Sequence, residues 1–144
     1  MAAGYSGTPL ARKLGIRDGI TVFVDRPPAG LDLDLAAGAV GRASVVRRLP
    51  ATADLTLTFH TRIATLRRRL PTLIEHTSTA GMVWVCWPKK YARRSVRNPD
   101  GPVSDLDENL VRELALALGV VDVKVAAIDE TWSGLKLVRR LSDR

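Results

Sequence analysis

Four short groups of residues in this sequence have side chains that can bind a ligand or exchange a proton. They are Asp25 with Arg26, His60 with Thr61, residues 87–90 (Trp-Pro-Lys-Lys) and residues 129–132 (Asp-Glu-Thr-Trp). Carboxylates and histidine exchange protons, lysine binds anions as a point charge, and tryptophan stacks on planar groups. Each group lies at the end of an apolar run. The candidate binding residues are therefore Asp25, His60, Trp87, Lys89, Lys90, Asp129, Glu130 and Trp132.

Apolar, β-branched runs predict the strands that carry these groups. The predicted strands cover residues 20–24, 44–48, 53–60, 82–87, 121–128 and 135–140. Gly81 is expected to break the chain before the run that starts at Met82. The short connection of residues 129–134 between the last two strands indicates an antiparallel hairpin.

Apolar residues at helical spacing predict the helices. A short lead-in helix starts after Thr8 and ends at Gly15, and a second helix runs from Ile63 to Ile74 with Pro71 as a kink or restart. A third runs from Leu106 to Leu118, with a capping signal at Ser104 and Asp107. Any helix around residues 31–37 is expected to be short, because glycines flank it.

The alternation of strands and helices predicts an α/β fold with three layers, a Rossmann-like and mostly parallel sheet of about six strands. The C-terminal antiparallel hairpin resembles the end of class I methyltransferase folds. Ligands of such sheets bind outside the carboxyl ends of the strands. The four groups are therefore expected to meet at one edge.

The turn after the first strand argues against a nucleotide cofactor. A dinucleotide or S-adenosylmethionine site on this fold needs a glycine-rich turn there, so that backbone amides approach the ligand. This sequence instead has Asp25, Arg26, Pro27 and Pro28, and prolines remove amide donors. No cofactor is expected. No metal site is expected either, because the chain has two histidines and one cysteine, Cys86, inside an apolar run.

Each candidate also has a purely structural interpretation. His60, at a strand end, is more often a surface or capping residue, and tryptophans beside a crevice more often fill the core beneath it. Asp129 and Glu130 are adjacent, so on an extended chain they point to opposite faces and do not pair as acid and base. One of them is suited to capping the turn.

The net charge is +7, from 22 basic and 15 acidic residues, and the excess is clustered. Such clusters attract phosphate-rich partners, although many form only a solvated surface. One cluster lies on the predicted second helix and the other in the loop of residues 88–103. Their members are Arg62, Arg67, Arg68 and Arg69, and Lys89, Lys90, Arg93, Arg94 and Arg97.

A length of 144 residues predicts a single domain, with a loose lead-in at residues 1–7 and a tail at 141–144. No run approaches the ~20 apolar residues of a membrane span, and the N-terminus lacks the apolar stretch of a signal peptide. We therefore expect a cytoplasmic protein without a membrane partner. Its oligomeric state does not follow from the sequence.

Three stretches carry a resemblance to a known family. They are residues 4–16 (GYSGTPLARKLGI), residues 87–90 (WPKK) and residues 121–135 (VDVKVAAIDETWSGL). The chain resembles small, mainly actinobacterial proteins catalogued as domain of unknown function 3052. The resemblance implies a stand-alone cytoplasmic domain and supplies no activity. It directs attention to the glycine-rich lead-in, where Tyr5 and Ser6 either contact a ligand from a flap or pack as part of a tail.

Three functions compete. The favoured one is a non-enzymatic binding or regulatory module that contacts a protein or anionic partner, since the cofactor turn is missing. The second is a degenerate methyltransferase-like enzyme, or a sensor of a phosphate-bearing metabolite. The third is nucleic-acid binding through the basic helix and loop, although no known nucleic-acid module is present.

Overall fold

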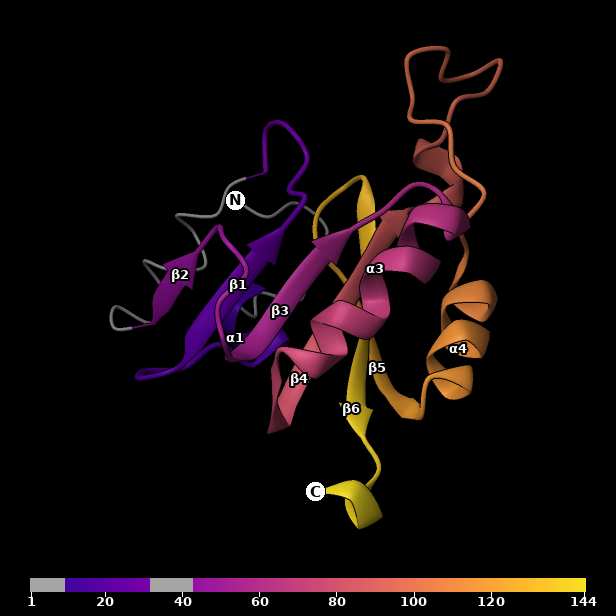
Figure 1. The fold of residues 1–144 in the computed structure, drawn as a ribbon. Helices are drawn as coiled ribbons and strands as arrows, with labels where there is room; N and C mark the ends of the chain where they lie inside the picture. The colour runs from indigo at the N-terminus through magenta and orange to yellow at the C-terminus, as the bar shows by residue number, and fades with distance from the viewer. Residues whose placement is uncertain (1–9, 32–42) are drawn as a thin grey trace.

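The computed structural model describes residues 10–31 and 43–144. Within these ranges the chain alternates strands with helices and closes with a hairpin (Figure 1). In chain order the elements are α1 (Leu10–Leu14), β1 (Thr21–Asp25), β2 (Ser44–Val46), β3 (Ala53–Phe59), α3 (Ile63–Glu75), β4 (Thr77–Pro88), η1 (Lys90–Ala92), α4 (Glu108–Ala117), β5 (Val120–Ala127), β6 (Trp132–Arg139) and η2 (Leu141–Asp143).

The strands form one six-stranded sheet in the order β2-β1-β3-β4-β6-β5. Strands β2, β1, β3 and β4 are parallel, so their arrowheads in Figure 1 point to the same edge, while β6 runs antiparallel to both β4 and β5. The predicted α/β fold with its closing hairpin is confirmed. Because the chain moves from β1 outward to β2 and then back to β3, the topological switch point lies between β1 and β3.

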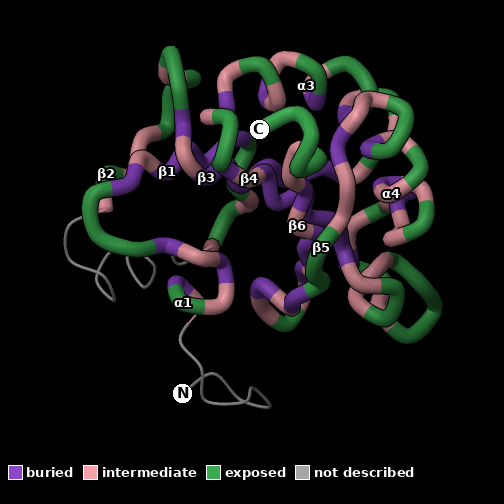
Figure 2. The backbone as a smooth tube through the Cα atoms, turned by 90° about the horizontal axis from the view of Figure 1, so that it is seen from below, coloured by how far each residue is buried: buried purple, intermediate pink, exposed green. Residues whose placement is uncertain are grey.

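Helices cover both faces of the sheet. Helix α1 lies on one side, and α3 and α4 lie on the other (Figure 2). The stripe of Leu66, Leu70 and Leu73 in α3 is buried, as expected for an amphipathic helix, and the helix continues through Pro71. Alternating residues of the central strands therefore serve two cores, one on each face.

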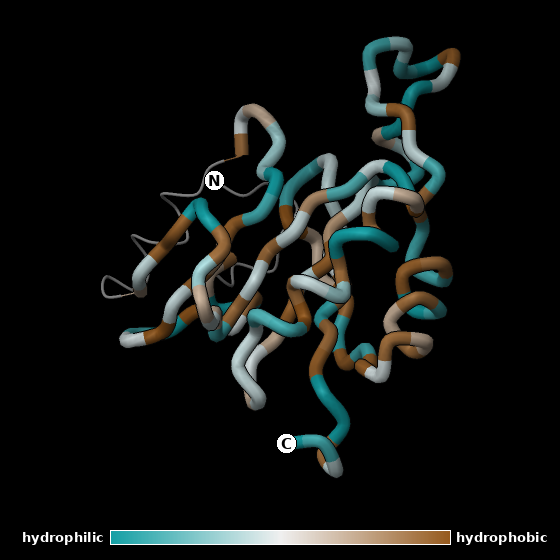
Figure 3. Tube along the Cα trace, in the orientation of Figure 1, coloured by the Kyte–Doolittle hydropathy of each residue, from teal (hydrophilic) through white to brown (hydrophobic). Residues whose placement is uncertain are grey.

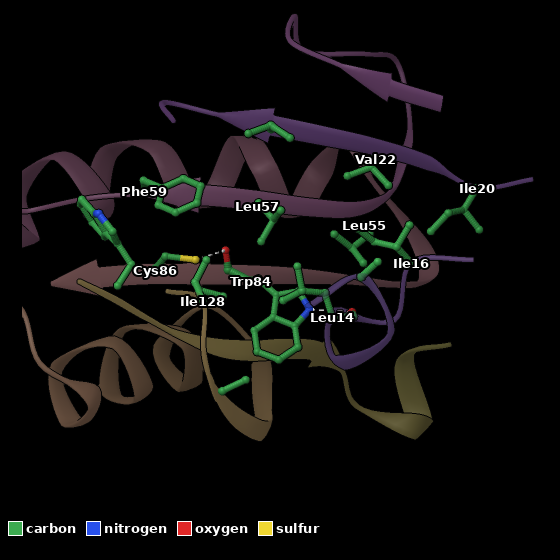
Figure 4. Close-up of a cluster of buried hydrophobic side chains, with 14 residues drawn as sticks. Leu14, Ile16, Ile20, Val22, Leu55, Leu57, Phe59, Trp84, Cys86 and Ile128 are labelled. Atoms are coloured by element: carbon green, nitrogen blue, oxygen red, sulfur yellow. Dashed lines mark hydrogen bonds between the residues drawn. The ribbon is translucent and has the colours of Figure 1, made fainter. Parts of the chain in front are cut away.

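Trp84 is the largest fully buried side chain in the core beneath α1. Its indole is fully buried among Leu55, Leu57 and Cys86, and its Nε1 donates to the Leu14 carbonyl oxygen at 2.9 Å (Figure 4). This bond ties the middle of β4 to the end of α1. Cys86 is also fully buried, and burial raises the pKa of its thiol, so it is the core residue that its sequence context predicted.

The expected break at Gly81 is wrong. Strand β4 starts at Thr77 and passes through Gly81, with a register shift opposite Ala53 and Leu55. A Cβ on Gly81 would lie 2.6 Å from the Asp54 carbonyl oxygen and 2.6 Å from Ser78 Oγ. The glycine is needed because two backbones approach closely at this irregularity, and it does not end the strand.

Three other boundaries differ from the prediction. Helix α4 begins after its N-cap Asp107, whose Oδ1 accepts from Leu110 N at 2.9 Å, so Leu106 precedes the helix. Strand β2 ends at Val46, and β6 begins at Trp132, three residues before the predicted start. The predicted short helix near residue 31 falls mostly outside the described residues, as do Tyr5 and Ser6.

Hydrophilic segments gather in the connections and at the C-terminal end (Figure 3). The connection from η1 to α4 projects beyond the carboxyl edge of the sheet (Figure 1). No helix among the described residues combines the length and apolarity needed to cross a bilayer.

Candidate functional site

The switch point is occupied by an ion pair between β1 and α3. Asp25, at the end of β1, is 6% exposed, and its Oδ1 accepts from Arg69 Nη2 at 2.9 Å. Its Oδ2 accepts from Arg69 Nε at 3.2 Å and from the Thr58 hydroxyl at 2.8 Å. The carboxylate is thus held by a forked guanidinium and a hydroxyl.

His60 extends this network from β3. Its Nε2 lies 2.7 Å from Thr58 Oγ1, and because the Thr58 hydroxyl proton goes to Asp25, we assign the Nε2 proton to His60. Its Nδ1 faces Thr65 Oγ1 at 3.3 Å, and Thr65 donates to the Arg62 carbonyl oxygen at the shorter distance of 2.9 Å. Nδ1 is therefore the unprotonated nitrogen of the ring.

His60 is 1% exposed, so the expected surface position is not what the structure shows. Burial and the nearby Arg26 and Arg69 guanidinium groups lower the pKa of His60 to about 4, against the opposing charge of Asp25. The imidazole is neutral at physiological pH. The network Arg69–Asp25–Thr58–His60 accordingly fills the switch point with mutually satisfied groups.

Arg69→Met is expected to lower the free energy of unfolding by about 2 kcal/mol, because it leaves a buried carboxylate without its cation. Breaking a fully buried pair costs more, but the Arg69 side chain is 33% exposed and water replaces part of its interaction. Urea unfolding measures the loss. The double substitution Asp25→Asn/Arg69→Met removes the charge as well and should recover most of it; strictly additive losses would contradict this account.

A second feature of the carboxyl edge is a cavity of about 550 Å³ beyond the end of β4. It lies among β4, η1, the first turn of α4 and the β5–β6 hairpin. Its volume is within the range of small-molecule sites. The residues that line it are Trp87, Lys89, Lys90, Tyr91, Asp107, Glu108, Asn109, Val125 and Ser133.

The charges around this cavity are not equivalent. Asp107 caps α4, and Glu108 is paired with Arg112, so both carboxylates already have partners. Lys89 Nζ donates to the Asp129 carbonyl oxygen at 2.7 Å and lies 5.8 Å from the centre of the Tyr91 ring. Lys90 is exposed and has no ion-pair partner among the described residues. Among the described residues, Lys90 is therefore the charged side chain of the lining that has no hydrogen-bond or ion-pair partner.

The hairpin residues have structural roles in the described chain. Asp129 Oδ1 accepts from the backbone N–H groups of Thr131 and Trp132, both at 2.8 Å, so Asp129 caps the turn. Trp132 is 9% exposed and makes an edge-to-face contact with Phe59. Glu130 is exposed. The edge residues predicted from sequence thus divide into the switch-point network, the cavity and this turn.

The arginine clusters separate in the same way. Arg62, Arg67 and Arg68 are exposed on α3 or at its start, whereas Arg69 is paired with Asp25. In the projecting loop, Arg93 donates to the carbonyl oxygens of Pro88 and Leu106, and Arg94 donates to that of Gly101 at 3.2 Å. Those two arginines hold the loop together, while Arg97 is exposed.

Sequence reasoning missed Thr58, and it placed Arg69 in the basic cluster of the helix without its partner Asp25. Thr58 alternates with Leu57 and Phe59 on a strand that was predicted correctly. Its side chain therefore points to the opposite face of the sheet, the one that α3 covers. Arg69 lies next to Leu70 on a helix with a buried stripe. The available signal was a polar residue, Thr58, at a strand position whose side chain points toward the face of the sheet that a predicted helix covers.

The turn after β1 has an unusual backbone. Arg26 is the one residue other than glycine with positive φ in the described chain, at 57°. Pro27 and Pro28 follow it, so two successive positions there lack amide donors. Within the described ranges, no three His, Cys, Asp or Glu side chains are grouped in a way that holds a metal ion.

Solved structures that include methyltransferases share this fold. The pyocyanin biosynthetic protein PhzM aligns with a TM-score of 0.63 at 11% identity over 92% of this chain, which spans 54% of PhzM. Magnesium protoporphyrin IX methyltransferase (ChlM) from Synechocystis PCC 6803, solved with bound SAH, aligns with a TM-score of 0.56 at 9% identity over 91% of this chain and 78% of its own.

A third alignment is with a chain of a complex that contains the Haloferax volcanii Trm112 methyltransferase activator. Its TM-score is 0.63 at 9% identity, over 91% of this chain and 87% of that chain. These likenesses concern the fold, since the identities are low. No protein-family model and no curated protein sequence matches this chain, so its resemblance to domain of unknown function 3052 stays a prediction.

Proposed function

We propose that this chain is a non-catalytic binding module on a methyltransferase-like scaffold, and that it takes an anionic ligand or an anionic group of a partner in the cavity beyond β4. The cavity of about 550 Å³ beside the unpaired Lys90 carries the proposal. The switch point supports the proposal because the groups there are already bonded to one another and are poorly suited to a nucleotide cofactor. There Arg69, Asp25 and Thr58 bond to one another, and Pro27 and Pro28 replace amide donors.

The recognition chemistry follows from the lining. Lys90 supplies a charge, Lys89 is held in place by the Asp129 carbonyl oxygen, and Tyr91 offers an aromatic face that is 75% exposed. An anionic group attached to a planar ring would contact both the ammonium and the aromatic face. Phenyl phosphate is a probe with these two properties.

Lys90→Glu is expected to weaken phenyl phosphate binding about tenfold, since it replaces an attractive charge with a repulsive one. Isothermal titration at low salt measures the affinity. Arg140→Glu is the matched control, because it makes the same change in charge after β6, at the opposite edge of the sheet. Equal affinities for Lys90→Glu and the unmodified protein would refute the cavity as the site.

The second candidate function is a methyltransferase-like enzyme or sensor, and the fold shared with methyltransferases supports it. S-adenosylhomocysteine separates the two functions. Under the binding-module proposal it leaves the thermal midpoint unchanged, whereas a cofactor site gives a concentration-dependent rise. Such a rise, abolished by Asp25→Asn and unaffected by Lys90→Glu, would favour the enzyme.

A further inference from the structure

Exposed arginines follow three neighbouring parallel strands at the carboxyl edge. Arg47 and Arg48 come directly after β2, and Arg26 comes directly after β1. Arg62 is at the N-cap position of α3, shortly after β3. All four are exposed, and none has an ion-pair partner among the described residues. Strands β2, β1 and β3 are adjacent and parallel, so these residues emerge at one edge. We call them the strand-end arginines.

Neighbouring strands lie about 5 Å apart, so the strand-end arginines start from positions spread over roughly 10 Å. Two carboxylates of the described residues lie close by, and both have partners. Asp25 is buried against Arg69, and Asp105 Oδ1 accepts from Ile63 N at 2.7 Å. The strand-end arginines therefore form a short cationic row whose described acidic neighbours have other partners.

The backbone at Arg26 is a second, independent observation. Pro27 disfavours the right-handed helical conformation at the preceding residue, and the chain turns there with a φ of 57°. Glycine or asparagine adopts that conformation at less cost, and for other residues it costs roughly 1–2 kcal/mol. An arginine in a strained turn at the switch point favours a functional role for its side chain.

The pKa of His60 indicates that the Arg26 charge is nearby. After burial, the Arg26 guanidinium is the largest influence that lowers the pKa of His60. Because β1 lies between β2 and β3 in the sheet, Arg26 is in the middle of the row. A ligand there would meet Arg26 first, with Arg62 on one side and Arg47 and Arg48 on the other.

From this arrangement we infer that the strand-end arginines bind a compact ligand with two or more linked phosphoryl groups. Guanidinium forks match phosphate oxygens in pairs, which a lysine row does not. Several cations over a short span favour linked phosphates over a single one. Among the described residues the one exposed aromatic side chain is Tyr91, which lines the cavity beyond β4, so the row lacks the aromatic side chains on which the bases of a nucleic acid would stack. The site is separate from the cavity beyond β4 and does not depend on its ligand.

Tripolyphosphate is the probe, titrated calorimetrically at low salt. Arg26→Asn is expected to weaken its binding about tenfold, by loss of one charge-assisted contact. Arg26→Gly should weaken binding equally while raising the urea midpoint, because glycine adopts the turn without strain. Arg17→Asn is the control, since Arg17 is exposed before β1, at the opposite edge, and should keep full affinity.

Competition identifies the source of the phosphoryl groups. Equal affinities for tripolyphosphate and ATP indicate an inorganic polyphosphate, and tighter binding of ATP indicates a nucleotide; orthophosphate should bind more weakly than either. The inference is overturned if tripolyphosphate does not bind, if Arg26→Asn changes its affinity less than twofold, or if Arg17→Asn weakens it as much. A single-stranded oligonucleotide that binds without being displaced by tripolyphosphate would also overturn it, in favour of a nucleic-acid surface.

Discussion

Between pH 6.5 and about 4, His60 alone is expected to lower the free energy of unfolding by about 3 kcal/mol. In this window the unfolded chain binds a proton on the imidazole, whereas the folded protein holds the ring neutral. Each added proton thus favours unfolding. Above pH 6.5 the ring is neutral in both states, and the contribution is complete and constant.

The matched variant is His60→Gln, whose amide N–H can still donate to Thr58 and does not titrate. Urea unfolding of both proteins from pH 8 to 4 gives two stability curves. Subtracting one curve from the other removes the contribution of the carboxylates, which titrate in both proteins. As the pH falls, the free energy of unfolding of the unmodified protein should drop by about 3 kcal/mol relative to that of the variant. Parallel curves would show that His60 is protonated in the folded protein.

Trp84→Ala should cost about 3–5 kcal/mol, because it empties a large volume in the core beneath α1. The side chain is fully buried, and its removal also leaves the Leu14 carbonyl oxygen without the indole donor. Gly134 shows how tightly the ring is packed, since a Cβ there would lie 3.1 Å from Trp84 Cε3. Neighbouring side chains cannot easily move in to fill the space.

Trp84→Phe separates packing from hydrogen bonding. Phenylalanine keeps most of the ring contacts and loses the donor, so a loss of about 1–2 kcal/mol is expected, most of it from the unsatisfied carbonyl. Hydrogen exchange should show faster exchange of the α1 amides in both variants, because the indole holds the end of that helix. A cost for Trp84→Ala below that of Trp84→Phe would contradict this description of the core.

The strands were predictable where their apolar runs are uninterrupted. Residues 20–24 and 53–60 were assigned almost to the residue, and the antiparallel hairpin followed from a short connection. The boundary at Gly81 failed because glycine has two meanings in a strand, a break or a close approach of backbones, and sequence does not distinguish them. The start of α4 failed because Leu106 is apolar but lies in the loop before the cap.

The candidate site was predictable as an edge but not as a set of contacts. The order of elements placed His60 and Asp25 at the same edge, and the structure links them through Thr58. Arg69 was grouped with exposed arginines because its neighbours Arg67 and Arg68 are exposed. Its partner Asp25 is 44 residues away, and only the packing of α3 on β1 brings the two together.

The sequence by itself determined the fold class, the shared edge and the absence of a glycine-rich turn after β1, because each depends on residue types at short spacing. The tertiary structure decided which charged side chains at that edge are paired within the protein and which remain able to bind a ligand. Asp25 and Arg69 neutralise each other, Asp107 caps a helix, and Lys90 and Arg26 keep their charges unpaired. Such pairing depends on contacts between residues far apart in the chain, which form only when the helices pack on the sheet.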